Sequence, residues 1–269
     1  MLFIISKKDT CLVTRPIFYN LHHSRDIMRL TAHSVNMQLT AQQVYDMLVV
    51  QNNIIGEKAI ISFILKGHDI KITSRDSVGN LLQEWLRDWL ITQGVVFGAS
   101  PGSQDFPDFQ LDLTDNTKGM LEVKSFDYDK SPNFDVAAFL AYRRSLLLHP
   151  YRLDSDYLIF GYSMVGHHIE IKDVWLKKVW EITGPSTDYA LKCQVKQGEI
   201  FNIRPTKWYT RSARDRGPKQ PNFTSALQFV QAFDSNQRQW TGTARDAVTS
   251  TWLTKVIAGY KVTTGKDLV

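Results

Sequence analysis

The clearest hydrophobic pattern in the chain lies at residues 77–93. Apolar residues recur there three and four positions apart, which places them on one face of an α-helix. This spacing predicts an amphipathic helix whose apolar face is buried on a sheet. The residues of that face are Val78, Leu81, Leu82, Trp85, Leu86, Trp89 and Leu90.

Shorter patterns continue along the chain. Alternating or β-rich runs predict strands at 95–97, 109–113, 120–126 and 157–162. Helical spacing predicts helices at 135–148, 174–182 and 223–233, and a hairpin is expected at 191–195 and 199–203. Helix, strands, helix and strand, in that order, are typical of an α/β fold. We therefore expect a mixed β-sheet flanked by helices.

The first 36 residues show neither helical nor strand periodicity. They form an N-terminal extension, a mispredicted start or an arm for a partner. Two histidines in this segment, His22 and His23, are adjacent and do not share a helix face, which argues against a metal pair.

The regular part of the chain is expected to begin near Met37. Thr40 and Gln43 form a capping box, which predicts a helix through Val44, Leu48 and Val49. Residues 234–269 form a C-terminal tail that is expected to be helical.

Composition narrows the class of protein. The 269 residues are 43% hydrophobic and 22% charged, which fits one large globular domain or two small ones. The two cysteines, Cys11 and Cys193, form no CxxC motif, so a zinc site built on paired cysteines is excluded and a reducing compartment is expected. No apolar run reaches the roughly 18 residues of a membrane span, and Lys7 follows the opening apolar residues too early for a secretory signal. We therefore expect a cytoplasmic protein with no membrane contact.

The net charge of +5 is concentrated in one segment. Residues 196–219 carry a net charge of +5, so the rest of the chain sums to zero. The same segment contains Trp208 and Tyr209, and aromatic rings among cations suit a polyanion with bases to stack on. The alternative is a solvated surface loop.

The segment from Phe106 to Ser125 carries the candidate chemistry. It is expected to form two strands joined by the polar turn at 114–119. Because side chains alternate along a strand, Glu122 and Lys124 share a face and Val123 points to the other. The hairpin should bring Asp108 opposite this pair.

Carboxylates that are forced together repel unless a cation neutralises them, and oxygen ligands on an open site suit Mg²⁺. The metal would activate a water, and Lys124 would hold that water or meet negative charge on the phosphate. The alternative is an exposed hairpin with an ordinary Glu–Lys pair. Two similar triplets, Asp69-Ile-Lys71 and Glu170-Ile-Lys172, lack the upstream Pro-Asp and are interpreted as solvated strand edges, with Lys172 kept as a possible phosphate contact.

Pro107-Asp108 followed by Glu122-Val123-Lys124 resembles the motif of the PD-(D/E)xK nuclease superfamily. Within it, the runs at 121–126, 131–139, 155–162 and 171–182 are similar to type II restriction endonucleases of the NgoBV and NlaIV kind. The similarity covers residues 37–233, which are therefore interpreted as the nuclease domain, with 196–219 as its DNA-contacting segment.

The resemblance implies a Mg²⁺-dependent phosphodiester hydrolase that cuts both strands of double-stranded DNA at a short palindrome, GGNNCC-like, leaving 5′-phosphates. Asp108, Glu122 and the Val123 carbonyl would bind the metal, and Lys124 would position water. Glu84 is a further candidate acid, although helical projection places it on the polar face of its helix.

The resemblance also implies partners. A palindrome is read most simply by a homodimer, and a cognate DNA methyltransferase would protect the same site without stable binding. Arg143 and Arg144 either contact the DNA backbone or belong to an exposed helix face, and Trp175 and Trp180 are expected to pack in the core. The expected DNA contacts are Arg204, Lys207, Arg211, Arg214, Arg216, Lys219, Lys177 and Lys178.

Other functions stay open. A nicking repair enzyme or a junction resolvase would share the same metal site. A non-catalytic protein would bind DNA with a steep salt dependence and leave it intact.

Overall fold

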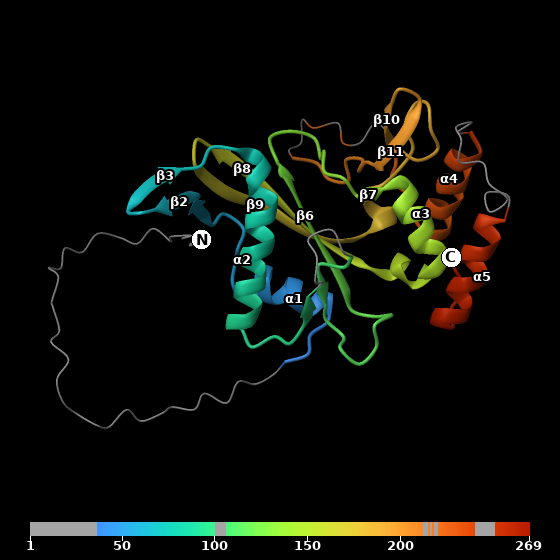
Figure 1. The fold of residues 1–269 in the computed structure, drawn as a ribbon, viewed down its shortest axis with the longest axis horizontal. Helices are drawn as coiled ribbons and strands as arrows, with labels where there is room; N and C mark the ends of the chain where they lie inside the picture. The colour runs from blue at the N-terminus through green and yellow to red at the C-terminus, as the bar shows by residue number, and fades with distance from the viewer. Residues whose placement is uncertain (1–36, 100–105, 212–214, 216, 218–219, 240–250) are drawn as a thin grey trace, which may run out of the picture.

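A mixed six-stranded sheet forms the centre of the protein (Figure 1). The computed structural model describes residues 37–99, 106–211, 215, 217, 220–239 and 251–269. Strands β6 and β8 run parallel, and every other neighbouring pair in this sheet is antiparallel. The strands, in spatial order, are β1 (Lys58–Ile60), β9 (His168–Lys178), β8 (Asp156–Val165), β6 (Met120–Asp127), β5 (Phe109–Gln110) and β4 (Gly98–Ala99).

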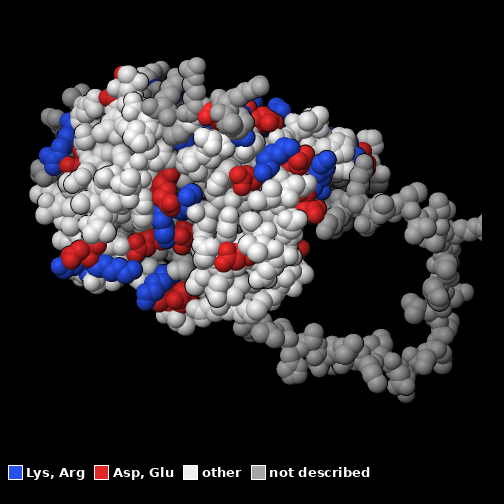
Figure 2. Space-filling view, turned by 180° about the vertical axis from the view of Figure 1, so that it is seen from behind, with Lys and Arg blue, Asp and Glu red and all other residues white. Residues whose placement is uncertain are grey.

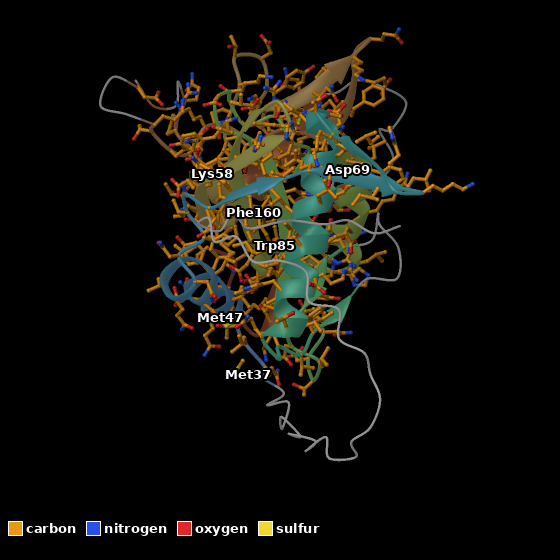
Figure 3. All side chains as sticks on the ribbon, turned by 90° about the vertical axis from the view of Figure 1, so that its left-hand side faces the viewer. Met37, Met47, Lys58, Asp69, Trp85 and Phe160 are labelled. Atoms are coloured by element: carbon orange, nitrogen blue, oxygen red, sulfur yellow. The ribbon has the colours of Figure 1, made fainter. Side chains whose placement is uncertain are left out.

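One face of the sheet is covered by α1 (Ala41–Asp46), the π-helical turn η1 (Met47–Gln51) and α2 (Val78–Thr92), which follows the 3₁₀ turn η2 (Arg75–Ser77). The capping box at Thr40 is present. Helix α2 buries Val78, Leu82, Leu86 and Leu90, as the hydrophobic spacing predicts. Figure 3 shows Trp85 on α2 and Phe160 of β8, which belong to the same apolar cluster.

A second apolar cluster covers the other face, to the right in Figure 1. Phe139, Phe233 and Trp252 stack in its centre, with ring centroids 4.2 and 4.9 Å apart. The cluster is built by α3 (Phe139–Leu148), η3 (Pro150–Asp154), η4 (Val179–Ile182), α4 (Ala226–Gln239), α5 (Trp252–Thr264) and the small sheet of β7 (Ala137–Ala138), β10 (Cys193–Lys196) and β11 (Glu199–Ile203). The expected mixed sheet with flanking helices is confirmed, and the C-terminal tail contains α5.

Some predicted elements are wrong. Residues 174–182 do not form one helix: residues 174–178 continue β9, and only 179–182 form the 3₁₀ turn η4. Both faces of β9 are covered, so its sequence lacks simple alternation. Lys177 and Lys178 thus lie on a strand. The strand expected at 95–97 lies later in the chain, as β4 at Gly98–Ala99. Val95 forms only an isolated β-bridge with Met37. Helix α3 begins later than expected because Ala137 and Ala138 pair with β11.

A two-stranded ribbon lies outside the main sheet. It consists of β2 (Ser62–Leu65) and β3 (His68–Lys71), and Figure 3 shows it reaching away from the body near Asp69. None of the helices in the described ranges is long and apolar enough to cross a membrane.

Candidate active site

The hairpin of β5 and β6 places Asp108 beside Glu122. Phe109 pairs with Leu121 and Gln110 with Met120, so the preceding residue, Asp108, comes next to Glu122 on the neighbouring strand. The polar turn closes this hairpin as the sequence predicts.

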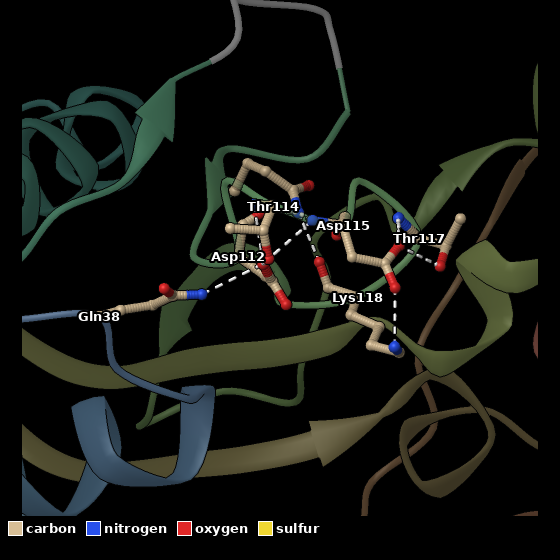
Figure 4. A network of polar contacts seen from close by, with 7 residues as sticks. Gln38, Asp112, Thr114, Asp115, Thr117 and Lys118 are labelled. Atoms are coloured by element: carbon tan, nitrogen blue, oxygen red, sulfur yellow. Dashed lines mark hydrogen bonds and ion pairs between the residues drawn. The ribbon is translucent and has the colours of Figure 1, made fainter.

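Hydrogen bonds within the turn hold its shape (Figure 4). Asp112 Oδ1 accepts from Thr114 N at 2.9 Å and from Thr114 Oγ1 at 2.7 Å. Asp115 accepts from Thr117 and forms a 2.7 Å ion pair with Lys118. At the end of the turn, Gly119 has a φ of +67°, and a Cβ there would lie 2.5 Å from Asp112 N. The turn therefore fixes the register of the two strands.

The Asp108 carboxylate is held from two sides. Its Oδ2 accepts a 2.7 Å hydrogen bond from Val123 N, and its Oδ1 accepts a 2.7 Å hydrogen bond from Gln83 Nε2 on α2. Burial raises the pKa of Asp108, and the hydrogen bond from Val123, the charge of Lys124 and the bond from Gln83 oppose that rise. Each carboxylate oxygen still has a lone pair to offer.

Glu122 is 8% exposed and pairs with Lys124, whose Nζ lies 2.7 Å from Glu122 Oε1. The other oxygen, Oε2, is buried and has no hydrogen-bond partner among the described residues. Burial raises the pKa of Glu122, the Lys124 charge lowers it, and the charge of Asp108 raises it. A buried carboxylate oxygen without a partner is costly, and a cation is one way to compensate it.

The donor set fits a hard divalent cation. The structure brings together Asp108, Glu122, Lys124 and the backbone of Val123, whose side chain lies in the apolar cluster on the opposite face. Carboxylate and carbonyl oxygens, completed by water, are the ligands that Mg²⁺ prefers. No group of three or more His, Cys, Asp or Glu side chains that could hold a metal occurs in the described part of the chain, so the candidate set contains two acids.

The structure does not bring Glu84 to this cluster. Its side chain is 68% exposed and lies 3.7 Å from Arg87 Nε. The preceding residue, Gln83, reaches Asp108 instead. Gln83 is not an acid, so a search for carboxylate ligands on this helix does not find it. The sequence signal for Gln83 is that it lies nearer than Glu84 to the buried face of the helix.

Those expected DNA-contacting cations that the structure describes have partners within the protein. Arg204 Nε lies 3.1 Å from Asp135 Oδ1, and Lys207 contacts Asp215 Oδ2. Arg211 donates from its Nη1 to the carbonyl oxygens of Tyr128 and Asp129, at 3.2 and 2.7 Å, and from its backbone to Asp215.

The two lysines of β9 are paired as well. Lys178 Nζ lies 2.7 Å from Asp156 Oδ1, and Lys177 Nζ lies 3.2 Å from Glu181 Oε1. Figure 2 shows acidic and basic side chains next to one another on the face that it draws. Arg214, Arg216 and Lys219 lie outside the described residues.

Aromatic packing fixes the middle of the basic segment against β6, the strand that carries Lys124. Trp208 and Tyr209 both pack on Phe126, with ring centroids 5.6 Å away in each case. Phe126 lies on β6, two residues after Lys124. Tyr209 also contacts Trp175 at 4.8 Å, and Trp175 and Trp180 pack against the second apolar cluster as expected. The rings therefore serve packing in this structure.

Several secondary expectations have clear outcomes. Arg143 is buried and donates to Gln237 Oε1, so it is not an exposed DNA contact, whereas Arg144 is exposed. Lys172 pairs with Glu170 at 2.7 Å.

The cysteine in the described part of the chain, Cys193, is a structural thiol. Burial raises the pKa of Cys193 to about 12, so its thiol stays protonated near neutral pH. His22, His23 and Cys11 lie outside the described residues.

Comparisons with known proteins agree with the resemblance in the motif. The model of the NgoBV restriction endonuclease family matches residues 38–269. The chain belongs to this family. The family match continues through α5, beyond the region 37–233 over which the resemblance was expected.

Two related restriction enzymes and one solved structure support the assignment of this chain to the family. The chain is 39% identical to the type II restriction enzyme NlaIV of Neisseria lactamica over 84% of this chain and 90% of the relative. It is 36% identical to the type II restriction enzyme NgoBV of Neisseria gonorrhoeae over 66% of this chain and 97% of the relative. The structure of an NlaIV restriction endonuclease superimposes with a TM-score of 0.78 at 38% identity, covering 87% of this chain and 93% of the other. The predicted family and the restriction-endonuclease-like fold are therefore confirmed.

Proposed function

We propose that this family member is a Mg²⁺-dependent type II site-specific deoxyribonuclease that hydrolyses both strands of DNA at a short palindrome. The observation that carries the proposal is the cluster of Asp108, Glu122 and Lys124 on one hairpin. One buried carboxylate oxygen of this cluster has no partner in the part of the chain that the structure describes. The relatives described as type II restriction enzymes support it.

Asp108, Glu122 and the Val123 carbonyl would hold the metal ion. When bound, Mg²⁺ supplies a water of lowered pKa and neutralises charge on the phosphate. Hydrogen bonds from Gln83 and Val123 keep Asp108 in one orientation. Glu122 orients the Lys124 ammonium, which donates to the attacking water or to the phosphate oxygen on which charge grows.

DNA binding is assigned to the basic segment 196–219 and to Lys177 and Lys178 of β9. The fixed position of Trp208 and Tyr209 next to Phe126 supports this assignment, because it attaches the segment to the strand that carries Lys124. Arginines would suit guanine edges and lysines would suit phosphates. Lys177, Lys178, Arg204 and Lys207 are paired in the free protein. A duplex therefore has to replace Glu181, Asp156, Asp135 or Asp215 as their partner.

The proposal includes a homodimer in which each subunit cuts one strand, 5′-phosphate ends and a GGNNCC-like target. It also includes a cytoplasmic location and a cognate methyltransferase that modifies the same site. A palindrome has two-fold symmetry, which a two-fold dimer matches.

Plasmid cleavage tests the proposal. Purified protein with Mg²⁺ should give discrete fragments, whereas EDTA should abolish cleavage and Asp108→Asn should lower the rate by about 10³-fold or more, because it removes a charged metal ligand. Sequencing of the ends gives the target and the cut position. Cleavage that persists in EDTA, or an active Asp108→Asn enzyme, would contradict the metal site.

Lys124→Met separates the role of the lysine from that of the metal. We expect a loss of about 10²- to 10³-fold in cleavage rate, the magnitude typical of a lost group that stabilises transition-state charge. Lys71→Met is a matched control, because Lys71 forms a similar pair with Asp69 at 2.6 Å on the exposed ribbon.

The products also distinguish the other candidate functions. A nick in only one strand would favour a repair enzyme, and a need for branched DNA would favour a resolvase. DNA that stays intact would favour a binding protein.

A further inference from the structure

Gln83 is the residue of α2 that reaches the candidate metal site. Its Nε2 and the backbone N–H of Val123 each donate a 2.7 Å hydrogen bond to Asp108, one to each carboxylate oxygen. One donor comes from a helix and the other from a neighbouring strand. Two donors from different elements fix the orientation of the carboxylate and leave one lone pair on each oxygen for an ion.

The backbone that carries Gln83 is fixed against the strand of the site. Leu82 and Leu86 on the same helix are buried in the cluster that contains Leu121 and Val123. One turn earlier, a Cβ added at Gly79 would lie 3.3 Å from Ser125 Oγ, which shows how closely α2 approaches β6. The carboxamide therefore reaches Asp108 from a packed helix, and such sites hold their geometry better than sites on loops.

A carboxamide has a specific chemical effect at this position. It donates hydrogen bonds and adds no charge, so the site keeps two carboxylates and one ammonium. An ionised acid at position 83 could not donate to Asp108 and would repel it. Glu84, the neighbouring acid on the helix, is exposed and pairs with Arg87.

We propose that Gln83 is a positioning residue that holds Asp108 in its metal-binding orientation, in place of a third acidic ligand. The inference rests on the proposed Mg²⁺ site. Residues that hydrogen-bond to metal ligands typically change metal affinity by about 10- to 100-fold when they are replaced.

Gln83→Met tests the hydrogen bond, because methionine has a similar length and helix propensity but no donor. The Mg²⁺ concentration that gives half-maximal cleavage should rise about 10- to 100-fold, and saturating Mg²⁺ should restore most of the rate. The melting temperature without metal should stay near that of the wild type, while the increase on adding Mg²⁺ becomes smaller.

Gln83→Glu should behave in the opposite way. Without metal, a third carboxylate beside Asp108 should lower the melting temperature, and Mg²⁺ should then raise it by more than in the wild type, because the added acid becomes a ligand. A residue that merely packs the helix would not enlarge the metal-dependent shift.

Gln42→Met is a matched control. Gln42 Nε2 donates to Asp46 Oδ1 at 2.9 Å on the exposed face of α1, a bond of the same kind away from the site. This variant should leave the Mg²⁺ dependence unchanged. If both Gln83 variants also keep the wild-type Mg²⁺ dependence, the inference is wrong even while Asp108→Asn remains inactive. If the wild type itself shows no response to Mg²⁺, the proposed metal site is wrong, and the role of Gln83 is wrong with it.

Discussion

Burial acts against the charge on Glu122, and Lys124 compensates only part of that effect. The same holds for Asp108, whose pKa is raised by burial despite two hydrogen bonds and the nearby ammonium. Ionising both carboxylates without a metal therefore lowers the stability of the folded protein. Binding a cation would relieve that cost.

Glu122→Gln is expected to raise the melting temperature in EDTA at neutral pH while abolishing cleavage. A carboxyl whose folded-state pKa is raised destabilises the native protein above its unfolded pKa, and protonation removes the penalty as pH falls through the folded pKa. The gain over the wild type should thus be largest near neutral pH and disappear in acid. Melting curves between pH 4 and pH 8 measure it.

Glu170→Gln is the control with the opposite sign. Glu170 pairs with Lys172, and hydrogen bonding to that lysine lowers its pKa. Its charge therefore favours the folded state above the unfolded pKa, and its removal should slightly lower the melting temperature at neutral pH. A Glu122→Gln variant that also melts lower at neutral pH would show that the pair with Lys124 outweighs burial.

The grouping of Asp108, Glu122 and Lys124 in the candidate site could be predicted from the sequence, because strand alternation fixes which side chains share a face. This argument places Glu122 and Lys124 together, and the length of the turn places Asp108 opposite them. The part played by Gln83 could not be predicted, since it depends on the distance between α2 and β6. The partners of Lys207 and Arg204 were missed because ion pairs depend on tertiary contacts that spacing does not reveal.

At the level of elements, the turn between β5 and β6 controls the geometry of the site. Leu111 N donates to Gly119 O at 2.7 Å, and the side chains of Asp112 and Asp115 accept hydrogen bonds inside the turn. These bonds fix how the strand before the turn aligns with the strand after it. A change in that alignment would separate Asp108 from Glu122.

Gly119→Ala is expected to destabilise the protein by about 1 kcal/mol or more, because it adds a side chain at a positive φ. The new Cβ would also collide with the backbone of Asp112. Cleavage should fall along with the melting temperature, since the collision lies in the turn that aligns the site.

Gly198→Ala provides the comparison. Gly198 has a φ of +80° in the turn of the β10–β11 hairpin, but a Cβ there would meet no atom of the described residues within 4 Å. We expect a smaller loss of stability and wild-type cleavage. Equal effects of the two variants on cleavage would mean that the first turn does not control the site.

The prediction of α2 succeeded and that of β9 failed because the two elements differ in how many of their faces are buried. Helix α2 shows a clear stripe, because its other side carries polar residues such as Glu84 and Asp88. Strand β9 has Val174 in one apolar cluster and Trp175 against the other, so its sequence lacks the alternation of a half-buried strand.

At the level of the whole molecule, the sheet separates two apolar clusters and carries the candidate site on its fourth and fifth strands, β6 and β5. The candidate site of one chain contains a single set of Asp108, Glu122 and Lys124. One such set accounts for cleavage of one strand, which is why the proposed double-strand cut needs two copies.

Mixed dimers test this arrangement. Wild-type protein that is unfolded and refolded with an excess of Asp108→Asn should form dimers with one active site, and these should nick supercoiled plasmid at the same target that the wild type cuts through. Nicked circles should accumulate as the variant is added. Linear product without nicked intermediate, together with a monomeric mass in sedimentation, would contradict a dimer with one cut per subunit.

The internal pairing of Lys177, Lys178, Arg204 and Lys207 also bears on how the protein would search a chromosome. Cations that are already neutralised attract random duplex weakly, so residence on the wrong sequence would be brief and escape fast. At the target sequence, base contacts add to the ion pairs that the cations form with phosphates. The protein therefore stays bound there for longer. Discrimination would then begin before any bond is cut.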